Sequence, residues 1–198
     1  MAHCTCDEGT APVTERPLYE TDPGAWEARL AEGNATQPRK RAAADALVRD
    51  EAGRMLIVDP TYKPGWDTPG GMCEANEPPH QTVRRELREE LGVDITVGRL
   101  LCVDWVPPHG PWDDTLFFVF DGGVLAPGQV SALRLADGEL AGFEFCSPAV
   151  AGRRLGSRTA RRIAAAWATL TDDAPPLYLV DGDGRSHDGL EPRVPAPD

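Results

Sequence analysis

The sequence predicts a mixed α/β domain, and three observations support this fold class. Short apolar segments bounded by turn residues indicate strands, the Glu-rich segment Pro78 to Leu91 has the pattern of an amphipathic helix, and Arg158 to Leu170 repeats apolar residues at helical spacing. The chain has 198 residues, which suits one domain with terminal extensions. We expect an N-terminal arm at residues 1–38, the folded domain at residues 39–171 and a C-terminal tail at residues 172–198.

The first expected elements are a helix in the arm and a β-hairpin at the start of the domain. Asp22 is suited to cap a helix over Pro23 to Glu32. Ala42 to Arg49 and Arg54 to Val58 are short apolar segments, and the turn-forming sequence Asp50-Glu51-Ala52-Gly53 separates them. The folded domain therefore begins with a hairpin.

The remaining elements follow in order along the chain. A loop rich in proline and glycine leads to Gly71, and the Glu-rich helix after it ends at Gly92. Beyond this helix we expect three strands, then the helix Arg158 to Leu170, and an edge strand in the tail. The four strands are Val97 to Val106, Thr115 to Asp121, Leu140 to Cys146 and Leu177 to Val180.

The composition restricts the classes of function. A net charge of -12 disfavours binding to a nucleic-acid backbone, which requires clustered Lys and Arg. No apolar run approaches the roughly 20 residues that cross a bilayer, and the N-terminus lacks the pattern of a secretory signal, so we expect a cytoplasmic protein without a membrane partner. The five cysteines are scattered, so we expect reduced thiols, with Cys4 and Cys6 in a loose tail rather than a zinc site.

The Glu-rich helix places three carboxylates in one sector. With Glu86 at zero on a helical wheel, Glu90 falls at about 40° and Glu89 at about -60°, and the apolar residues occupy the neighbouring sector. This pattern favours a helix that buries its apolar stripe against a sheet and lines a cleft with its acidic stripe. The alternative is a solvated helix face, because Arg85 and other arginines interleave with the glutamates.

The loop before the helix favours the cleft. Gly70 and Gly71 permit close backbone approach and let carbonyl oxygens face a cation without an intervening Cβ. Mg²⁺ prefers carboxylate, carbonyl and water oxygens. A glycine loop beside a Glu-rich helix therefore predicts a Mg²⁺ site, which could also accept Mn²⁺.

The run from Gly71 to Val93 reads GMCEANEPPHQTVRRELREELGV and matches every fixed position of G-x₅-E-x₇-R-E-U-x-E-E-x-G-U, with U aliphatic. This run resembles the Nudix box. The resemblance implies an α/β/α sandwich with a mixed β-sheet, in which the box forms a loop, a helix and a loop. It also implies a hydrolase that cleaves the phosphoanhydride bond of a nucleoside diphosphate linked to another moiety, such as ADP-ribose, a nucleotide sugar or a (d)NTP.

The resemblance assigns roles to the box residues. It implies that Arg85 holds Glu77 through charge-assisted hydrogen bonds, and that Glu86 or Glu89 is the general base. The implied metal ligands are three carboxylates and a backbone carbonyl, namely Glu86, Glu89, Glu90 and Gly70 or Gly71. Some members of the family instead take the base or a further ligand from a loop beyond the box. The candidates are Asp113, Asp114, Glu139 and Glu144, each with a solvated loop carboxylate as the favoured alternative. Among the four, Glu139 is the preferred candidate.

Residues outside the box are expected to select the substrate, a small nucleotide. Trp105 and Trp112 are candidates for a wall on which a base stacks, with Phe117 or Phe118, although aromatic residues on strands more often belong to the core. The candidates for phosphate contacts are Arg39, Lys40, Arg41 and Lys63, with a solvated entry to the domain as the favoured alternative.

Two other functions agree with parts of the sequence. A catalytically idle nucleotide-sensing module of the same fold would be expected to show substituted box glutamates, and none is substituted. An isoprenoid diphosphate isomerase of related fold would need a catalytic cysteine in a dedicated motif, which Cys73, Cys102 and Cys146 lack. The sequence leaves open whether two copies form a homodimer.

Overall fold

The computed structural model describes residues 16–135 and 138–184, and the chain divides into two compact units between Arg39 and Lys40. The first unit contains helices α1 (Leu18–Thr21) and α2 (Pro23–Thr36). The Asp22 carboxylate accepts a hydrogen bond from the Ala25 N–H at 3.0 Å and caps α2, which continues beyond the predicted end of this helix. The predicted state of Cys4 and Cys6 lies outside the described residues.

The second unit is built on a mixed sheet of seven strands among the described residues. In chain order they are β1 (Arg41–Asp50), β2 (Met55–Pro60), β3 (Gly70–Met72), β4 (Leu100–Val106), β5 (Thr115–Leu125), β6 (Leu140–Cys146) and β7 (Leu177–Val180). The order across the sheet is β6-β2-β1-β5-β4-β7, and β3 pairs with β1. The β1–β5 and β4–β7 pairs are parallel and the others antiparallel, so the sheet is mixed as predicted.

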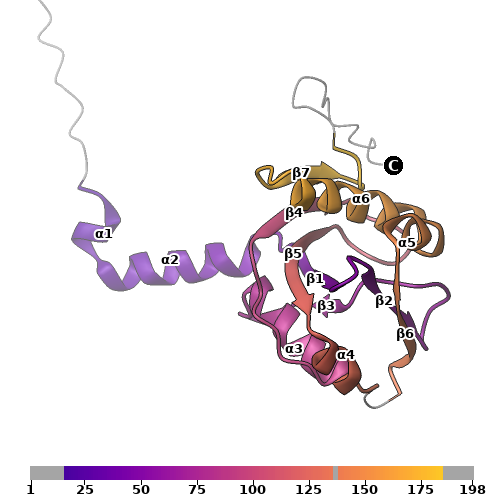
Figure 1. The fold of residues 1–198 in the computed structure, drawn as a ribbon. Helices are drawn as coiled ribbons and strands as arrows, with labels where there is room; N and C mark the ends of the chain where they lie inside the picture. The colour runs from indigo at the N-terminus through magenta and orange to yellow at the C-terminus, as the bar shows by residue number, and fades with distance from the viewer. Residues whose placement is uncertain (1–15, 136–137, 185–198) are drawn as a thin grey trace, which may run out of the picture. The chain divides into compact units, whose positions relative to one another are not determined.

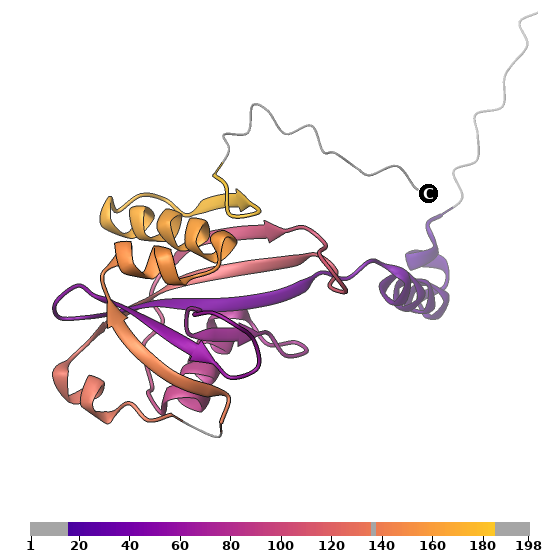
Figure 2. The same ribbon diagram turned by 90° about the vertical axis from the view of Figure 1, so that its right-hand side faces the viewer.

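Helices cover both faces of this sheet. Helices α3 (Pro79–Leu91) and α4 (Pro127–Ala132) lie on one face, and α5 (Pro148–Arg154) and α6 (Ser157–Thr171) lie on the other (Figures 1 and 2). This arrangement is the predicted α/β/α sandwich. No helix in the described parts of the chain is long and apolar enough to cross a membrane.

The sheet separates two hydrophobic cores, because β1 alternates its side chains between its faces. Ala44, Ala46 and Val48 pack with the buried stripe of α3, whereas Leu47 packs with the buried residues of α5 and α6. The α3 stripe consists of Val83, Leu87 and Leu91, each with no exposed surface. Burial of this stripe fixes which face of α3 remains for the glutamates.

The structure corrects several predicted elements. Gly70 to Met72 form strand β3 rather than a loop, because they pair in register with Ala43 to Asp45 despite the low strand preference of glycine. Helices α4 and α5 lie in segments for which no helix was expected. Strand β4 begins at Leu100 rather than Val97, where the pairing register of β4 with β5 shifts. In the core, Cys102 and Cys146 are buried free thiols.

Candidate active site

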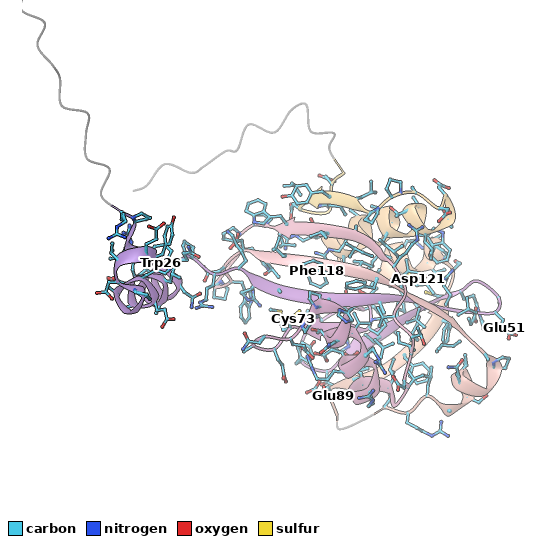
Figure 3. The ribbon with its side chains drawn as sticks, turned by 90° about the vertical axis from the view of Figure 1, so that its left-hand side faces the viewer. Trp26, Glu51, Cys73, Glu89, Phe118 and Asp121 are labelled. Carbon is cyan, nitrogen blue, oxygen red and sulfur yellow. The ribbon has the colours of Figure 1, made fainter. Side chains whose placement is uncertain are left out.

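Helix α3 carries the acidic stripe, and its ends are defined by local sequence signals. Pro79 occupies its first turn, and Gly92 ends it in the left-handed conformation with φ 66°, where its N–H donates to the carbonyls of Arg88 and Leu87. Because the apolar stripe faces the sheet, Glu86 and Glu90 come to the side of the helix next to β3, and Glu89 lies beside Arg85. Glu89 is the outermost of the three, with 60% of its side chain exposed (Figure 3).

One arginine connects most of the box carboxylates. Arg85 donates from Nε and Nη2 to the two oxygens of Glu77, at 2.9 and 3.0 Å, and from Nη1 to Glu86 and Glu89 at 2.9 and 3.0 Å. Its Nη2 also donates to the Met72 carbonyl at 3.1 Å. The bidentate contact holds the pKa of Glu77 at about 2, far below its usual 4.5. The contact between Arg85 and Glu77 that the Nudix box implied is therefore present.

Gly70 and Gly71 let the carboxylates of Glu86 and Glu90 lie close to the backbone of β3. A Cβ added to Gly71 would lie 2.6 Å from the Glu86 carboxyl carbon, so only glycine leaves room for this carboxylate. The Gly70 N–H donates to Glu90 Oε2 at 3.2 Å. Gly70 has φ 143°, and an added Cβ would lie 2.6 Å from the Cα of Asp45 on β1.

Further carboxylates surround Glu90. Asp45 lies buried beneath Gly70 and accepts a hydrogen bond from the Thr68 hydroxyl, and Asp67 forms an ion pair with Lys63. Burial raises the pKa of Glu90 to about 8, with the negative charges of Glu86, Glu139 and Asp67 acting in the same direction. Burial and the Asp67 charge also raise the pKa of Asp45 well above its usual value. This concentration of buried negative charge is one that a cation would stabilise.

The donor set fits a hard divalent cation, although the side chains are not gathered into a cluster of ligands. In the described part of the chain, no three His, Cys, Asp or Glu side chains are grouped as a metal site. Arg85 holds Glu86 and Glu89, whereas Glu90 faces the Gly70 N–H. The carboxylate and carbonyl oxygens present here are nevertheless those that Mg²⁺ and Mn²⁺ prefer.

Two adjoining cavities form a cleft that starts at these carboxylates. The first, of about 450 Å³, is lined by Gly70, Gly71, Asp45 and Glu90 among others. The second, of about 580 Å³, extends to the start of α6. Both share a set of lining residues, namely Arg41, Lys63, Asp67, Met72, His109, Trp112 and Phe117.

The other residues proposed from the sequence separate into two groups. Trp112 lines both cavities, is 54% exposed and stacks under the Arg41 guanidinium at 4.4 Å, whereas Trp105 lines neither and donates to Asp114 at 2.7 Å. Glu139 is exposed, and its charge contributes to the raised pKa of Glu86 and Glu90.

The remaining loop carboxylates are placed as follows. Glu144 pairs with Arg154, Asp114 also pairs with Lys40, and Asp113 is exposed in the loop between β4 and β5.

A family model described as the NUDIX domain matches residues 39–167, about two thirds of the chain, and covers strands β1 to β6, α3 and most of α6. The chain belongs to the Nudix family. The Nudix match agrees with the geometry, because box residues in β3 and α3 line the first cavity.

Two curated relatives and one solved structure show how far the similarity extends. The chain is 53% identical over 36 residues to an 8-oxo-dGTP diphosphatase of Proteus vulgaris, which covers 18% of this chain and 32% of the relative. It is 37% identical over 70 residues to an RNA pyrophosphohydrolase of Gluconacetobacter diazotrophicus, which covers 31% of this chain and 42% of the relative. The chain thus spans less than half the length of these two relatives.

The solved structure extends the comparison to a larger share of the chain. The crystal structure of a UDP-X diphosphatase superposes with a TM-score of 0.58 at 21% identity, over 78% of this chain and 74% of the other. At this identity the similarity establishes the Nudix fold, which agrees with the α/β/α architecture described above.

Several cleft residues of this Nudix domain were not found from the sequence. Asp45 interrupts the apolar strand β1, and an isolated carboxylate in a strand that is otherwise buried is a signal that could have identified it. Arg158, Arg161 and Arg162 lie on α6 and line the second cavity. They gave no such signal, because the packing of α6 decides which of its arginines face the cleft.

Proposed function

We propose that this Nudix protein is a hydrolase that cleaves a phosphoanhydride bond in a nucleoside diphosphate derivative, in a reaction that depends on Mg²⁺ or Mn²⁺. The observation that carries the proposal is the position of Glu86 and Glu90 beside the β3 glycines, at one end of a cleft large enough for a nucleotide. The complete Nudix box and the diphosphatase and pyrophosphohydrolase names of the relatives support the same reaction class.

The proposed roles follow from the contacts of each residue. Glu86, Glu89, Glu90 and a carbonyl of Gly70 or Gly71 would hold the metal ion. A divalent ion bound there would supply positive charge for the phosphoryl oxygens and acidify an attacking water. Glu86 or Glu89 would accept the proton of this water, with Glu139, whose charge acts on Glu86 and Glu90, as the alternative base. Arg85, held by Glu77, would keep the glutamates oriented toward the cleft.

Trp112 and Arg41 are the proposed contacts for the nucleoside and the phosphates. Trp112 offers an exposed aromatic face inside the cleft, and a base can stack on such a face without sequence-specific contacts. Arg41 has no carboxylate partner among the described residues and lines both cavities, so its charge is available to a phosphate. Trp105 is not assigned this role, because it lines neither cavity of the cleft.

The test is a substrate panel assayed with Mg²⁺ or Mn²⁺ and with a chelator. It contains nucleoside di- and triphosphates, ADP-ribose, NADH, nucleotide sugars and dinucleoside polyphosphates. We expect Glu89→Gln and Glu90→Gln to lower kcat on the preferred compound by about a hundredfold or more. Glu74→Gln is the matched control, because Glu74 is exposed at a variable position of the same box.

The outcomes separate the functions that the sequence left open. Hydrolysis by wild type and Glu74→Gln alone supports the proposal. Equal activity in all variants refutes the assigned roles. Binding of a nucleotide without turnover by wild type would instead fit an idle nucleotide-sensing module. Replacing Glu139 by Gln then decides between the box glutamates and Glu139 as the base.

A further inference from the structure

The two ends of the cleft carry opposite charge. The cavity beside the box is lined by three carboxylates, Asp45, Asp67 and Glu90, against the two cations Arg41 and Lys63. Among the described residues, the second cavity is lined by five Arg or Lys side chains against two carboxylates, and Asp104 and Asp183 pair with two of these arginines from outside the lining. Three of the five cationic side chains lie at the start of α6, in a group that we call the basic end: Ser157, Arg158, Thr159, Arg161 and Arg162.

Arg162 is the most deeply placed member of the basic end. Its side chain is 3% exposed, its Nε donates to Asp104 at 2.9 Å, and its guanidinium lies 3.8 Å from the centre of the Phe117 ring. Asp104 is itself fixed by the Gly182 N–H at 3.0 Å. Within the described residues the two terminal nitrogens of Arg162 have no hydrogen-bond partner, although this side chain lines the cavity. A buried guanidinium held in one orientation with free donors is suited to bind an anion.

The first turn of α6 adds further donors. Its N-cap is Gly156, no side chain caps it among the described residues, and its first turn contains no acidic residue. The N–H groups of a first helical turn have no partner within the helix, and the helix dipole places positive potential there. Ser157 and Thr159 contribute hydroxyl groups to the same cavity wall.

Arg158 and Arg161 lie where the helix dipole disfavours cations. Arg158 pairs with Asp181, and Arg161 contacts Asp181 and Asp183, so the chain neutralises part of this charge. Arg161 also donates to the Asp181 carbonyl at 2.6 Å. Two arginines near the uncapped start of a helix repel its dipole, and an anion bound among them relieves that repulsion.

We propose that the basic end binds a second phosphate group, which the substrate carries in addition to the diphosphate that is cleaved. This inference rests on the proposed function, because it assumes that the scissile diphosphate lies at the box. It specifies the substrate as a nucleoside diphosphate derivative with a separate phosphate on either of the two moieties that the diphosphate joins. The carboxylate end of the cleft and the basic end then bind different parts of one molecule.

Three compounds that differ by a single phosphate test this proposal. They are ADP-ribose, its 2′-phosphate and its 1″-phosphate, which carry the added group on the adenosine side and on the distal ribose respectively. Their binding is measured by titration calorimetry with EDTA present, so the result does not depend on turnover. We expect one of the phosphorylated compounds to bind about tenfold more tightly than ADP-ribose, with an advantage that decreases as salt is added.

Two variants locate the bound phosphate, and a third serves as the control. The double variant Arg158→Ala, Arg161→Ala and the single variant Ser157→Asp are expected to reduce the advantage to less than about twofold. Ser157→Asp places a carboxylate in the first turn, which favours the helix while occupying the anion position, so its folding is preserved. Arg153→Ala on α5 is the matched control, because Arg153 lines neither cavity and bonds to the Ala149 carbonyl.

Equal binding of all three compounds, or the absence of binding, overturns the inference. It is also overturned if the tighter binding of the phosphorylated compound persists in both the double variant and Ser157→Asp. Preferential binding without hydrolysis of any panel compound would refute the proposed hydrolase and leave the basic end supported. Hydrolysis of ADP-ribose with equal binding of the three compounds would support the proposed hydrolase and refute the phosphate site at the basic end.

Discussion

The two neighbouring glycines of the box should respond differently to the same substitution. In Gly71→Ala the new Cβ meets the end of the Glu86 side chain, 2.6 Å from its carboxyl carbon, and nothing in the Gly71 backbone conformation opposes an L residue. In Gly70→Ala the new Cβ would lie 2.6 Å from the Asp45 Cα, at a φ of 143° that L residues rarely adopt. The first change displaces a flexible side chain, whereas the second displaces backbone.

The distances give the expected magnitudes. Ordinary contact requires at least 3.4 Å, so Glu86 must retreat from 2.6 Å by about 1 Å. A misplacement of that size in a catalytic constellation costs about a hundredfold in rate, while the free energy of unfolding should change by about 1 kcal/mol or less. Gly70→Ala should lose about 3 kcal/mol or more, because strand β3 must shift against β1.

The assays are kcat/KM on the preferred substrate and thermal unfolding followed by circular dichroism. Gly142→Ala is the matched control, since a Cβ there meets no atom within 4 Å. Full activity of Gly71→Ala would refute the role given to the Glu86 position. If Gly71→Ala lowered the free energy of unfolding as much as Gly70→Ala, the distinction between displacing a side chain and displacing backbone would be refuted.

Three further predictions concern residues around the site. Asp104→Ala leaves Arg162 buried without its partner and should cost about 3 to 5 kcal/mol in thermal or urea unfolding, so an unchanged midpoint would contradict the buried pair. Glu77→Gln removes a carboxylate whose pKa is lowered to about 2; its stabilising contribution is complete above pH 4.5 and disappears as the pH falls toward 2, so wild type and variant should converge in acid. A difference in their unfolding free energy that does not vary with pH would contradict this. Trp112→Ala should raise KM about tenfold with little change in kcat or melting temperature, and an unchanged KM would exclude base stacking there.

The elements predicted correctly are those with their own local signals. Helix α3 has Pro79 at its start, Gly92 at its end and a complete apolar stripe between them. Its bounds and its buried face could therefore be predicted from its own residues. Helix α5 has comparable signals, a capping Ser147 followed by Pro148, but its seven residues are too few to show periodicity. Strand β3 contains two glycines, and only its pairing with β1 makes it a strand.

The site was predictable where one segment contains it. The box glutamates, Arg85 and Glu77 lie within a single stretch of 23 residues, so their spacing alone indicated that they belong together. The far wall of the cleft combines β1, the loop that bears Trp112, and α6, and such a combination is fixed by tertiary packing. Asp104 and Arg162 illustrate the difference, because they are 58 residues apart and meet in the interior.

The separation of the two hydrophobic cores by the sheet has a consequence for any molecule that fills the cleft. Helix α3 belongs to one core and α6 to the other. A ligand bound at both ends of the cleft therefore contacts two helical layers that the sheet separates. Such a ligand ties the two layers together as well as occupying the site, and its binding energy adds to the resistance of the whole domain to unfolding. A compound that binds at one end alone contacts only one of the two helices, so it does not link the two layers.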